Sequence, residues 1–231
     1  MKPFFLFPPH PSKAMKIPHT DVGKYEVMGG WVAQRKFNGS HFVGHLYDNV
    51  LTCWNRQGQP FTTYKLTNEM NQCFAMLPGV DPKVEYVFDG ELLHTKAKSK
   101  ITNQQAATNT IVLFDLLYCG RHLLRESFIE RFEILKKICG YPTNPEPKYR
   151  AIEVSSVGHS DIWLAELFFN EFEYHFYEMY DHDEDDLDIF PEIEGLVLKR
   201  LGNSPLDSGK KAYDVNWMMR VRKPKPKTYS F

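Results

Sequence analysis

Hydrophobic and polar segments alternate at short intervals along much of this chain. Runs rich in β-branched and aromatic residues, bounded by Gly, Asn or Pro, predict β-strands near residues 30–37, 41–47, 50–55, 84–93, 110–118, 195–200 and 217–222. Helical patterns do not alternate regularly with these strands. This order favours an α+β fold in which antiparallel β-sheets are flanked by helices.

Apolar residues at helical spacing are clearest over residues 126–138, where Gly140 and Pro142 provide a stop. Two more helices are expected, one within residues 64–77 and an aromatic-rich one over 162–180. The Pro- and His-rich start of the chain indicates an irregular segment over residues 1–25. We therefore expect one main domain over residues 26–223, followed by a basic tail over 224–231.

Composition indicates a packed protein of a reducing compartment. With 231 residues, 42% of them hydrophobic, the chain is able to bury a core. The four cysteines form no Cys-x-x-Cys pair, which argues against a zinc site and a disulfide framework. The first apolar run is too short for a signal peptide, and no other run reaches membrane-spanning length. We expect a soluble cytoplasmic protein without a membrane partner.

Charge is uneven along the chain, although the net charge is only −1. Acidic residues accumulate between Arg150 and Lys199, most densely over 181–186, and we interpret this run as a solvated surface loop. Basic residues dominate from Lys199 to the end. Such an end can meet phosphates, so Lys210, Lys211 and Lys223 are candidates for contact with nucleic acid.

The first piece of candidate chemistry is Lys36-Phe37-Asn38-Gly39, at the end of a predicted strand. A lysine held there, partly desolvated and near other cations, loses affinity for its proton and becomes a nucleophile. Gly39 would let backbone approach a phosphate closely. Taken alone, the segment is more typical of a surface lysine before a turn glycine.

Two further carboxylate-bearing segments stand in apolar runs. In Asp89-Gly90-Glu91, one carboxylate could orient a ribose hydroxyl and the other a divalent cation, unless the segment is a solvated turn. Glu194 and Lys199 could supply a metal-binding oxygen and a phosphate-binding cation. Their odd spacing would place them on opposite faces of a regular strand, so one of them is expected at a bend.

Phe114 ends a strongly apolar run before Asp115. Its ring could be a stacking platform for a purine or simply a core aromatic.

Taken in order, these pieces resemble the covalent nucleotidyltransferases: ATP-dependent DNA ligases, RNA ligases and mRNA capping enzymes. The ordered set is Lys36-x-x-Gly39, Asp89-Gly90-Glu91, Phe114-Asp115, Glu194-Gly195 through Lys199, and Arg220-x-Arg222. The chain is most similar to the DNA ligases, because Arg56-x-Gly58 and the blocks 111–120 and 130–135 resemble elements of those enzymes. The resemblance covers about residues 30–223.

The resemblance implies a ligase-type nucleotidyltransferase (adenylation) domain. Lys36 would attack the α-phosphate of ATP and form a lysyl-AMP, AMP would pass to a 5′-phosphate at a strand break, and a 3′-hydroxyl would seal it. Lys199, Arg220 and Arg222 would bind the α-phosphate, and Glu194 with Glu91 would hold Mg²⁺ (or Mn²⁺). Glu91 or Arg56 would contact the ribose or the phosphate of the incoming strand. Phe114 would stack on adenine, and Gln34 would form hydrogen bonds with the adenine edge.

The chain also departs from the DNA-ligase pattern. Those enzymes usually have Lys-x-Asp-Gly-x-Arg, whereas Asn38 and His41 stand here, and this change favours RNA ligases. Arg220-x-Arg222 replaces Lys-x-Lys. DNA ligases continue into an OB-fold domain, which is expected to be absent here. Either the basic tail or a partner would substitute for it, or the first step of the reaction would be slow.

We therefore expect a minimal, monomeric ATP-dependent DNA ligase acting on nicked double-stranded DNA. Its small size is compatible with a virus-encoded enzyme. An ATP-dependent RNA ligase is the alternative, and a catalytically inactive relative that binds nucleic-acid ends is a third. The intact set of Lys36, Glu91, Glu194 and Lys199 favours an enzyme, because a binding module needs no nucleophile.

Overall fold

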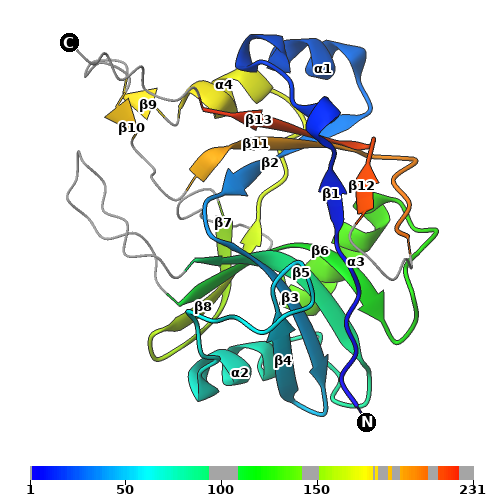
Figure 1. Cartoon of the computed structure of the whole chain (residues 1–231), viewed down its shortest axis with the longest axis vertical. Helices are drawn as coiled ribbons and strands as arrows, with labels where there is room; N and C mark the ends of the chain where they lie inside the picture. Colours follow the sequence, from blue (N-terminus) through cyan, green and yellow to red (C-terminus); the bar gives the residue numbers. More distant parts are fainter. Residues whose placement is uncertain are drawn as a thin grey trace.

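Two β-sheets form the body of the molecule (Figure 1). The computed structural model describes residues 2–93, 109–141, 151–178, 180–181, 187–188, 193–207 and 213–223. The smaller sheet has the order β13-β11-β2, with β2 at Trp31–Phe37, β11 at Ile193–Arg200 and β13 at Met218–Arg222. The larger sheet has the order β4-β3-β5-β6-β8-β7, with strands Val50–Trp54, Ser40–Tyr47, Tyr86–Leu93, Thr110–Cys119, Ser160–Ala165 and Ala151–Val157.

Strand pairing is mainly antiparallel, as expected from the sequence. Within the two large sheets, the parallel pair is β6–β8. A short parallel pair joins β1 (Pro9–Pro11) to β12 (Tyr213–Val215), and a short antiparallel pair joins β9 (Tyr180–Asp181) to β10 (Leu187–Asp188). The predicted α+β class is therefore confirmed.

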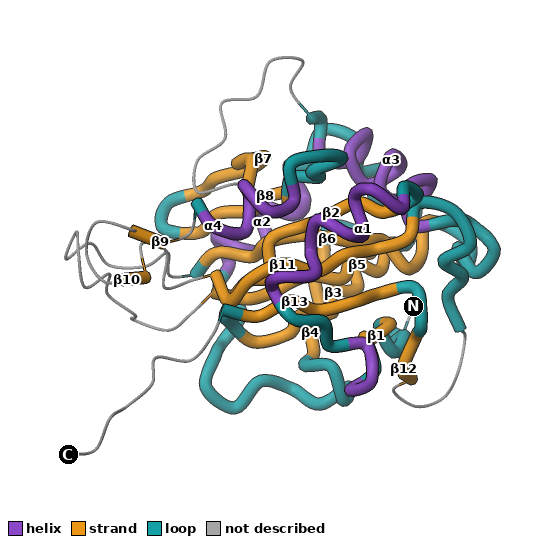
Figure 2. The backbone as a smooth tube through the Cα atoms, turned by 90° about the horizontal axis from the view of Figure 1, so that it is seen from above, coloured by secondary structure: helices purple, strands orange, loops and turns teal. Residues whose placement is uncertain are grey.

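Helices cover the outer faces of both sheets (Figures 1 and 2). Helices α1 (Val22–Met28) and α4 (Phe172–Tyr177) lie over the three-stranded sheet, where Phe172 and Phe176 pack with Leu196, Leu198 and Val221. Helices α2 (Asn68–Ala75) and α3 (Phe128–Cys139) pack against the six-stranded sheet. Two hydrophobic clusters result, one on each side of the six-stranded sheet.

The ends of α3 follow from local chemistry. Ser127 and Glu130 form a reciprocal capping box at its start, and Gly140 ends it in the left-handed region with a φ of 64°. The structure thus confirms the helix predicted over 126–138, displaced by one or two residues. The helix expected within 64–77 is shorter, because Thr67 caps the first turn of α2.

The long helix predicted over residues 162–180 is wrong. Strand β8 occupies the first part, and only the six residues of α4 are helical. Ile162 and Leu164 face one hydrophobic cluster while Trp163 and Ala165 face the other. A strand buried on both faces shows no polar alternation, so its sequence looks like that of a buried helix.

Residues 1–25, which we expected to be irregular, contain β1, two 3₁₀ turns (Lys13–Met15 and His19–Asp21) and the start of α1. The expected domain boundary between residues 25 and 26 falls inside α1, while the expected tail 224–231 lies outside the described residues. Within the described ranges, no helix combines the length and apolar character needed to cross a membrane.

A buried ion pair ties α3 to the six-stranded sheet. Arg131 binds both carboxylate oxygens of Asp115 at 2.9 Å and donates to the carbonyls of Glu126 and Ser204. Because both charges are buried, they need this complete set of partners. Asp115 and Arg131 belong to the two blocks that resemble DNA ligases, and here they act as scaffold for the neighbouring Phe114.

Candidate active site

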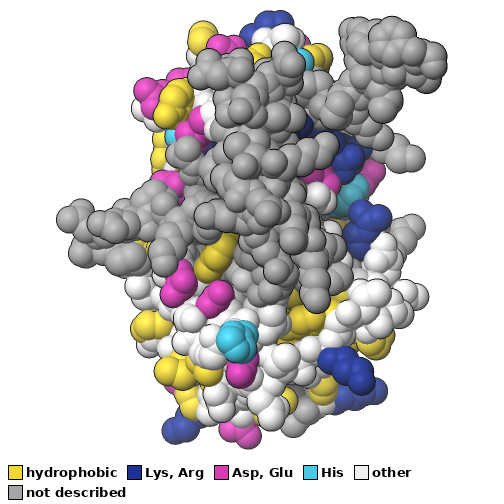
Figure 3. Space-filling view, turned by 90° about the vertical axis from the view of Figure 1, so that its left-hand side faces the viewer, with side chains coloured by type: hydrophobic (Ala, Val, Ile, Leu, Met, Phe, Trp, Pro, Cys, Tyr) yellow, Lys and Arg dark blue, Asp and Glu magenta, His cyan; other side chains and the backbone are white. Residues whose placement is uncertain are grey.

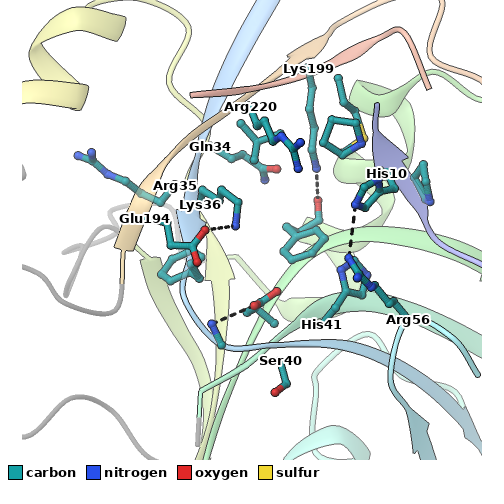
Figure 4. Close-up of a pocket in the computed structure, with 18 of the residues that line it drawn as sticks. His10, Gln34, Arg35, Lys36, Ser40, His41, Arg56, Glu194, Lys199 and Arg220 are labelled. Atoms are coloured by element: carbon teal, nitrogen blue, oxygen red, sulfur yellow. Dashed lines mark hydrogen bonds and ion pairs between the residues drawn. The ribbon is translucent and has the colours of Figure 1, made fainter. Parts of the chain in front are cut away.

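A cavity of about 460 Å³ lies between the two sheets (Figure 4). Strands β2, β11 and β13 line it from one side, β3, β5 and β6 from the other, and β1 and residues 55–57 complete the wall. Nine residues that the sequence assigned to nucleotide binding line this one cavity: Gln34, Lys36, Arg56, Glu91, Phe114, Glu194, Lys199, Arg220 and Arg222. The fold therefore brings the whole predicted set together, while the roles of these residues stay predictions.

The register of the three-stranded sheet aligns its polar side chains. Gln34 and Arg220 are both paired with Val197, so the three form one row across the sheet. Lys36 and Arg222 are both paired with Gly195 in the next row on the same face. Because alternate residues share a face of a strand, one face of the sheet presents these cations and the amide to the cavity.

A β-bulge turns Glu194 into the cavity. Ile193 pairs with Phe37 and Gly195 with Lys36, so Glu194 is the extra residue between them. Gly195 adopts a φ of +144°, and a Cβ there would overlap the carbonyl oxygen of Val221. The bend that the odd spacing to Lys199 required is therefore present, and the bulge provides it.

A second bulge turns Phe114. In the pairing of β5 with β6, Asp89 is opposite Asp115 and Gly90 is opposite Leu113, which leaves Phe114 unpaired. Its ring lines the cavity and makes an edge contact with the ring of His41, 5.8 Å between centroids. Phe114 is thus a cavity aromatic, not a fully buried core residue.

Lys36 lies where the chain passes from one sheet to the other. Strand β2 ends at Phe37 and β3 begins at Ser40, in the opposite sheet. A Cβ on Gly39 would overlap the carbonyl oxygen of Leu92, so the crossing requires glycine. The Gly39 N–H donates to Glu91 Oε1 at 2.9 Å. Backbone packing therefore requires this glycine, and its expected close approach to a phosphate stays a prediction.

Opposite charges are paired inside the cavity. Lys36 Nζ lies 2.6 Å from Glu194 Oε2, and Arg222 lies 3.3 Å from the same oxygen. Burial raises the pKa of the Glu91 carboxyl, although His41, Lys36 and the Gly39 N–H act in the opposite direction. The cavity thus combines two carboxylates with several cations, an arrangement suited to a phosphorylated ligand.

Lys199 is the most deeply buried cation of the site. Burial lowers its pKa to about 8, although Asp115 and Asp89 favour the charged form. Its Nζ donates to the Phe114 carbonyl at 3.3 Å and lies 4.1 Å from the centre of the Phe128 ring. Lys199 is therefore held with little freedom at the inner wall of the cavity.

The Gln34 amide is buried without a hydrogen-bond partner among the described residues. Both Nε2 and Oε1 are unsatisfied, which is costly inside a protein. A neighbouring donor and acceptor match the edge of a purine base, which carries the same two functions.

Two histidines that line the cavity, His10 and His41, were not among the site residues predicted from the sequence. His41 Nε2 lies 2.7 Å from the buried Asp89 carboxylate. Burial alone would lower the pKa of His41, but the charges of Asp89 and Glu91 raise it above its usual value. His10 comes from β1 and had no sequence signal, because it precedes Lys36 by 26 residues in a Pro-rich stretch. His41, in contrast, occupies the position of the family's arginine and could have been considered.

The carboxylates of the cavity could supply some of the oxygen ligands of a divalent cation. Among the described residues, no group of three or more His, Cys, Asp or Glu could hold a metal ion alone. Mg²⁺, however, usually binds one or two carboxylates together with substrate phosphates and water. Glu91 and Glu194, both lining the cavity, provide such an incomplete oxygen set.

The predicted nucleic-acid contacts are only partly described. Arg56 lines the cavity and is exposed, and the backbone N–H of Lys223 donates to the Glu194 carbonyl. Lys210 and Lys211 lie outside the described residues. Among the described side chains that Figure 3 shows, several basic ones lie beside acidic and histidine side chains.

Comparison with known proteins identifies the fold. No protein-family model and no curated protein matches the chain. Among solved structures, one described as "Pmar-Lig_Pre." matches with a TM-score of 0.52 and 14% identity over 90% of this chain and 46% of that chain. The ligase domain of M. tuberculosis LigD matches with a TM-score of 0.47 and 17% identity over 83% of this chain and 52% of that chain. The ATP complex of the bacteriophage T7 ATP-dependent DNA ligase matches with a TM-score of 0.45 and 11% identity over 89% and 67%.

The chain spans about half the length of the first two of these structures. At such identities the likeness concerns the fold alone. The chain has the α+β fold of a ligase-type nucleotidyltransferase (adenylation) domain.

Proposed function

We propose that this chain is an ATP-dependent polynucleotide ligase that joins a 5′-phosphate to a 3′-hydroxyl at a nick, and that its substrate is DNA. The observation that carries the proposal is the single cavity that nine residues from distant parts of the chain share, with Lys36 in its wall. The unpaired Gln34 amide and the ring of Phe114 suit a purine, and the cations suit its phosphates.

In the first step, Lys36 Nζ attacks the α-phosphorus of ATP. An amine attacks through its lone pair, so Lys36 must leave its ion pair with Glu194 and lose one proton to solvent before the attack. The nitrogen loses a second proton to solvent as the N–P bond forms. The new N–P bond forms as the bond to the β-phosphate oxygen breaks, and pyrophosphate leaves with the electron pair. Lys199, Arg220 and Arg222 line the cavity as fixed cations that can stabilise the charge on the phosphate.

Two transfers complete the reaction. A 5′-phosphate oxygen of the strand attacks the adenylyl phosphorus, the N–P bond breaks, and the Lys36 nitrogen regains its two protons from solvent. The 3′-hydroxyl then attacks the 5′-phosphorus, loses its proton and releases AMP. A divalent cation bound at Glu91 and Glu194 would supply charge neutralisation for phosphate oxygens.

Covalent labelling tests this function. Incubation with α-³²P-ATP and Mg²⁺ should give an acid-labile label on the wild-type chain and none on Lys36→Ala. Lys137→Ala, which changes an exposed lysine on α3, should label like the wild type. A label that persists in Lys36→Ala would contradict the assignment of the nucleophile, and a label from GTP alone would indicate capping-type chemistry.

The identity of the strand is tested separately. Asn38 and His41 stand where DNA ligases usually carry Asp and Arg, which favours an RNA ligase as the second candidate. Sealing of matched nicks in DNA and RNA duplexes by the labelled enzyme decides between them. A chain that neither labels with ATP nor seals a pre-adenylylated nick would be a catalytically inactive relative that binds nucleic-acid ends.

A further inference from the structure

The start of the chain spans both sheets beside the cavity. We call residues 4–11 the N-terminal strap. At one end Phe4 packs against His45 and Tyr118 of the six-stranded sheet, with ring centroids 4.8 and 5.1 Å apart. Beyond its other end, the Ile17 N–H donates to the Arg220 carbonyl of the three-stranded sheet at 3.2 Å. Figure 1 shows this path from the N-terminus along the molecule to β1.

A second cavity of about 220 Å³ adjoins the first. It is lined by Pro8, His10, His41, Arg56, Gln57, Tyr213 and Asp214. His10, His41 and Arg56 line both cavities and therefore mark their junction. Figure 4 shows these three side chains together, across the larger cavity from Lys36 and Glu194.

His10 connects a carboxylate to Arg56 at this junction. Its Nδ1 lies 3.1 Å from Asp214 Oδ1, and its Nε2 lies 3.5 Å from Arg56 Nη1. An ionised carboxylate only accepts hydrogen bonds, so Nδ1 carries the proton. In the neutral ring Nε2 is then an acceptor, and the guanidinium donates to it.

Among the described residues, the acceptor for the Arg56 guanidinium is His10 Nε2, which belongs to the strap. The parallel pairing of β1 with β12 fixes the backbone of His10, because His10 lies opposite Asp214 in the register. Arg56 itself is exposed and follows β4 in a short turn that Gly58 closes with a φ of +76°. A long exposed side chain in a turn loses its preferred direction without a partner.

We propose that His10 is a positioning residue: through it, the N-terminal strap holds the Arg56 guanidinium at the junction of the two cavities, ready to receive a phosphate group of the substrate. The inference rests on the proposed function for the source of the phosphate, which is either the ATP tail or the 5′-phosphate of the strand. Arginine binds either phosphate through the same fork of N–H donors.

Acid should disrupt this contact. Burial lowers the pKa of His10, Arg56 and Arg220 lower it further, and Asp214 opposes them, so the ring is neutral at neutral pH. As the pH falls through this lowered pKa, Nε2 gains a proton, stops accepting and repels Arg56. His41, the other histidine at the junction, has a raised pKa, so its own titration lies at higher pH.

The test separates the two phosphate sources. The rate of Lys36 labelling is measured against ATP concentration, and the transfer of AMP from labelled enzyme to a nicked duplex is measured in a single turnover. His10→Ala should slow one of these steps about fivefold to tenfold, the typical effect of losing one long hydrogen bond of about 1 kcal/mol. A slower first step assigns the phosphate to ATP, and a slower second step assigns it to the strand.

Three controls make a merely structural role visible. His10→Gln should retain more activity than His10→Ala and lose the acid limb below pH ~6.5, because an amide oxygen accepts from Arg56 but does not titrate. His10→Ala should add little in an Arg56→Ala background. His159→Ala, at an exposed histidine on the β7–β8 turn, should behave like the wild type.

A result in which the His10 and Arg56 effects add fully, or in which His10→Ala equals His159→Ala, would overturn the proposal. A measurement independent of activity is the NMR titration of the His10 ring. In Arg56→Ala the pKa of His10 should rise, because a neighbouring cation is removed. An unchanged pKa of His10 would overturn the contact between His10 and Arg56, and this measurement does not require an active enzyme. Failure of the chain to label with ATP would count against the proposed function, not against this contact.

Discussion

Gln34 and Lys199 are two buried polar residues that destabilise the folded protein without a ligand. Their side chains would make favourable interactions only when a ligand is bound. Gln34 has an unsatisfied amide, and Lys199 has a pKa lowered to about 8 by burial. Neither is explained by stability. Groups kept in a cavity at such a cost are typical of binding sites, where natural proteins give up stability for function.

Replacement of Gln34 by Leu should separate stability from binding. The variant removes an unpaired buried amide, so the free energy of unfolding should rise by about 1–2 kcal/mol. The ATP concentration needed for half-maximal labelling should increase by roughly 10- to 100-fold, the typical value of a paired amide on a base edge. Urea denaturation and labelling measure the two effects. A less stable variant with unchanged ATP dependence would contradict an unpaired amide.

Replacement of Lys199 by Met should stabilise the protein at pH 7. Between pH 10.5 and about 8 the unfolded chain takes up a proton on Lys199 that the folded chain does not, so stability falls across this window as the pH falls. The resulting penalty at neutral pH is on the order of 3 kcal/mol. The variant should recover much of it at pH 7, gain nothing above pH 10.5 and fail to label.

Urea unfolding at several pH values checks this prediction. Lys137→Met, at an exposed position of α3, is the matched control and should change stability little at any pH. A Lys199→Met protein that is less stable at pH 7 would mean that the cation is needed to hold Asp89 and Asp115.

Two irregular strands set the geometry at the scale of elements. Bulges in β11 and β6 turn Glu194 and Phe114 toward the cavity, while regular pairing elsewhere keeps Gln34, Lys36 and Arg220 on one face. A bulge inserts one residue and so reverses the side-chain direction beyond it. Glu194 and Lys199 can share the cavity because Glu194 is the extra residue of the bulge in β11.

Gly195→Ala should therefore damage both fold and site. The new Cβ would overlap the Val221 carbonyl, and a φ of +144° is unfavourable for alanine, so unfolding should become easier by roughly 1–3 kcal/mol. Labelling should fall strongly, because Glu194 would lose its direction. Gly202→Ala is the control, since a Cβ there meets no atom within 4 Å. Equal stability of the two variants would argue against the strained bulge.

The whole molecule places cations in one cavity although its net charge is −1. Two sheets meet around that cavity, and the residues in its wall run from Pro9 to Arg222. At this cavity, affinity for a nucleic acid would come from a few local phosphate contacts.

Binding of a nicked duplex should weaken with salt. If about three phosphates are contacted, the affinity should fall roughly 40-fold between 50 and 200 mM salt, because bound cations release counterions from the duplex. Fluorescence anisotropy with a labelled nick measures this slope, with an intact duplex as control. Affinity that does not change with salt would remove nucleic acid as the partner.

The sequence by itself determined most of the local structure and the membership of the cavity. Strands and the helix that Ser127 caps were readable because each carries its signal within a few neighbouring positions. The cavity residues from Gln34 to Arg222 were found through the ordered resemblance to the covalent nucleotidyltransferases, since each piece alone is ambiguous. The odd spacing of Glu194 and Lys199 even predicted a bend.

Only the tertiary structure decided the rest. Strand β8 is buried on both faces, so its sequence carries no period that distinguishes it from a helix. His10 reaches the cavity through pairing with residues about 200 positions later, and Gly39 is required by the Leu92 carbonyl of another strand. Contacts of this kind depend on how the two sheets meet, and no short stretch of sequence contains that information.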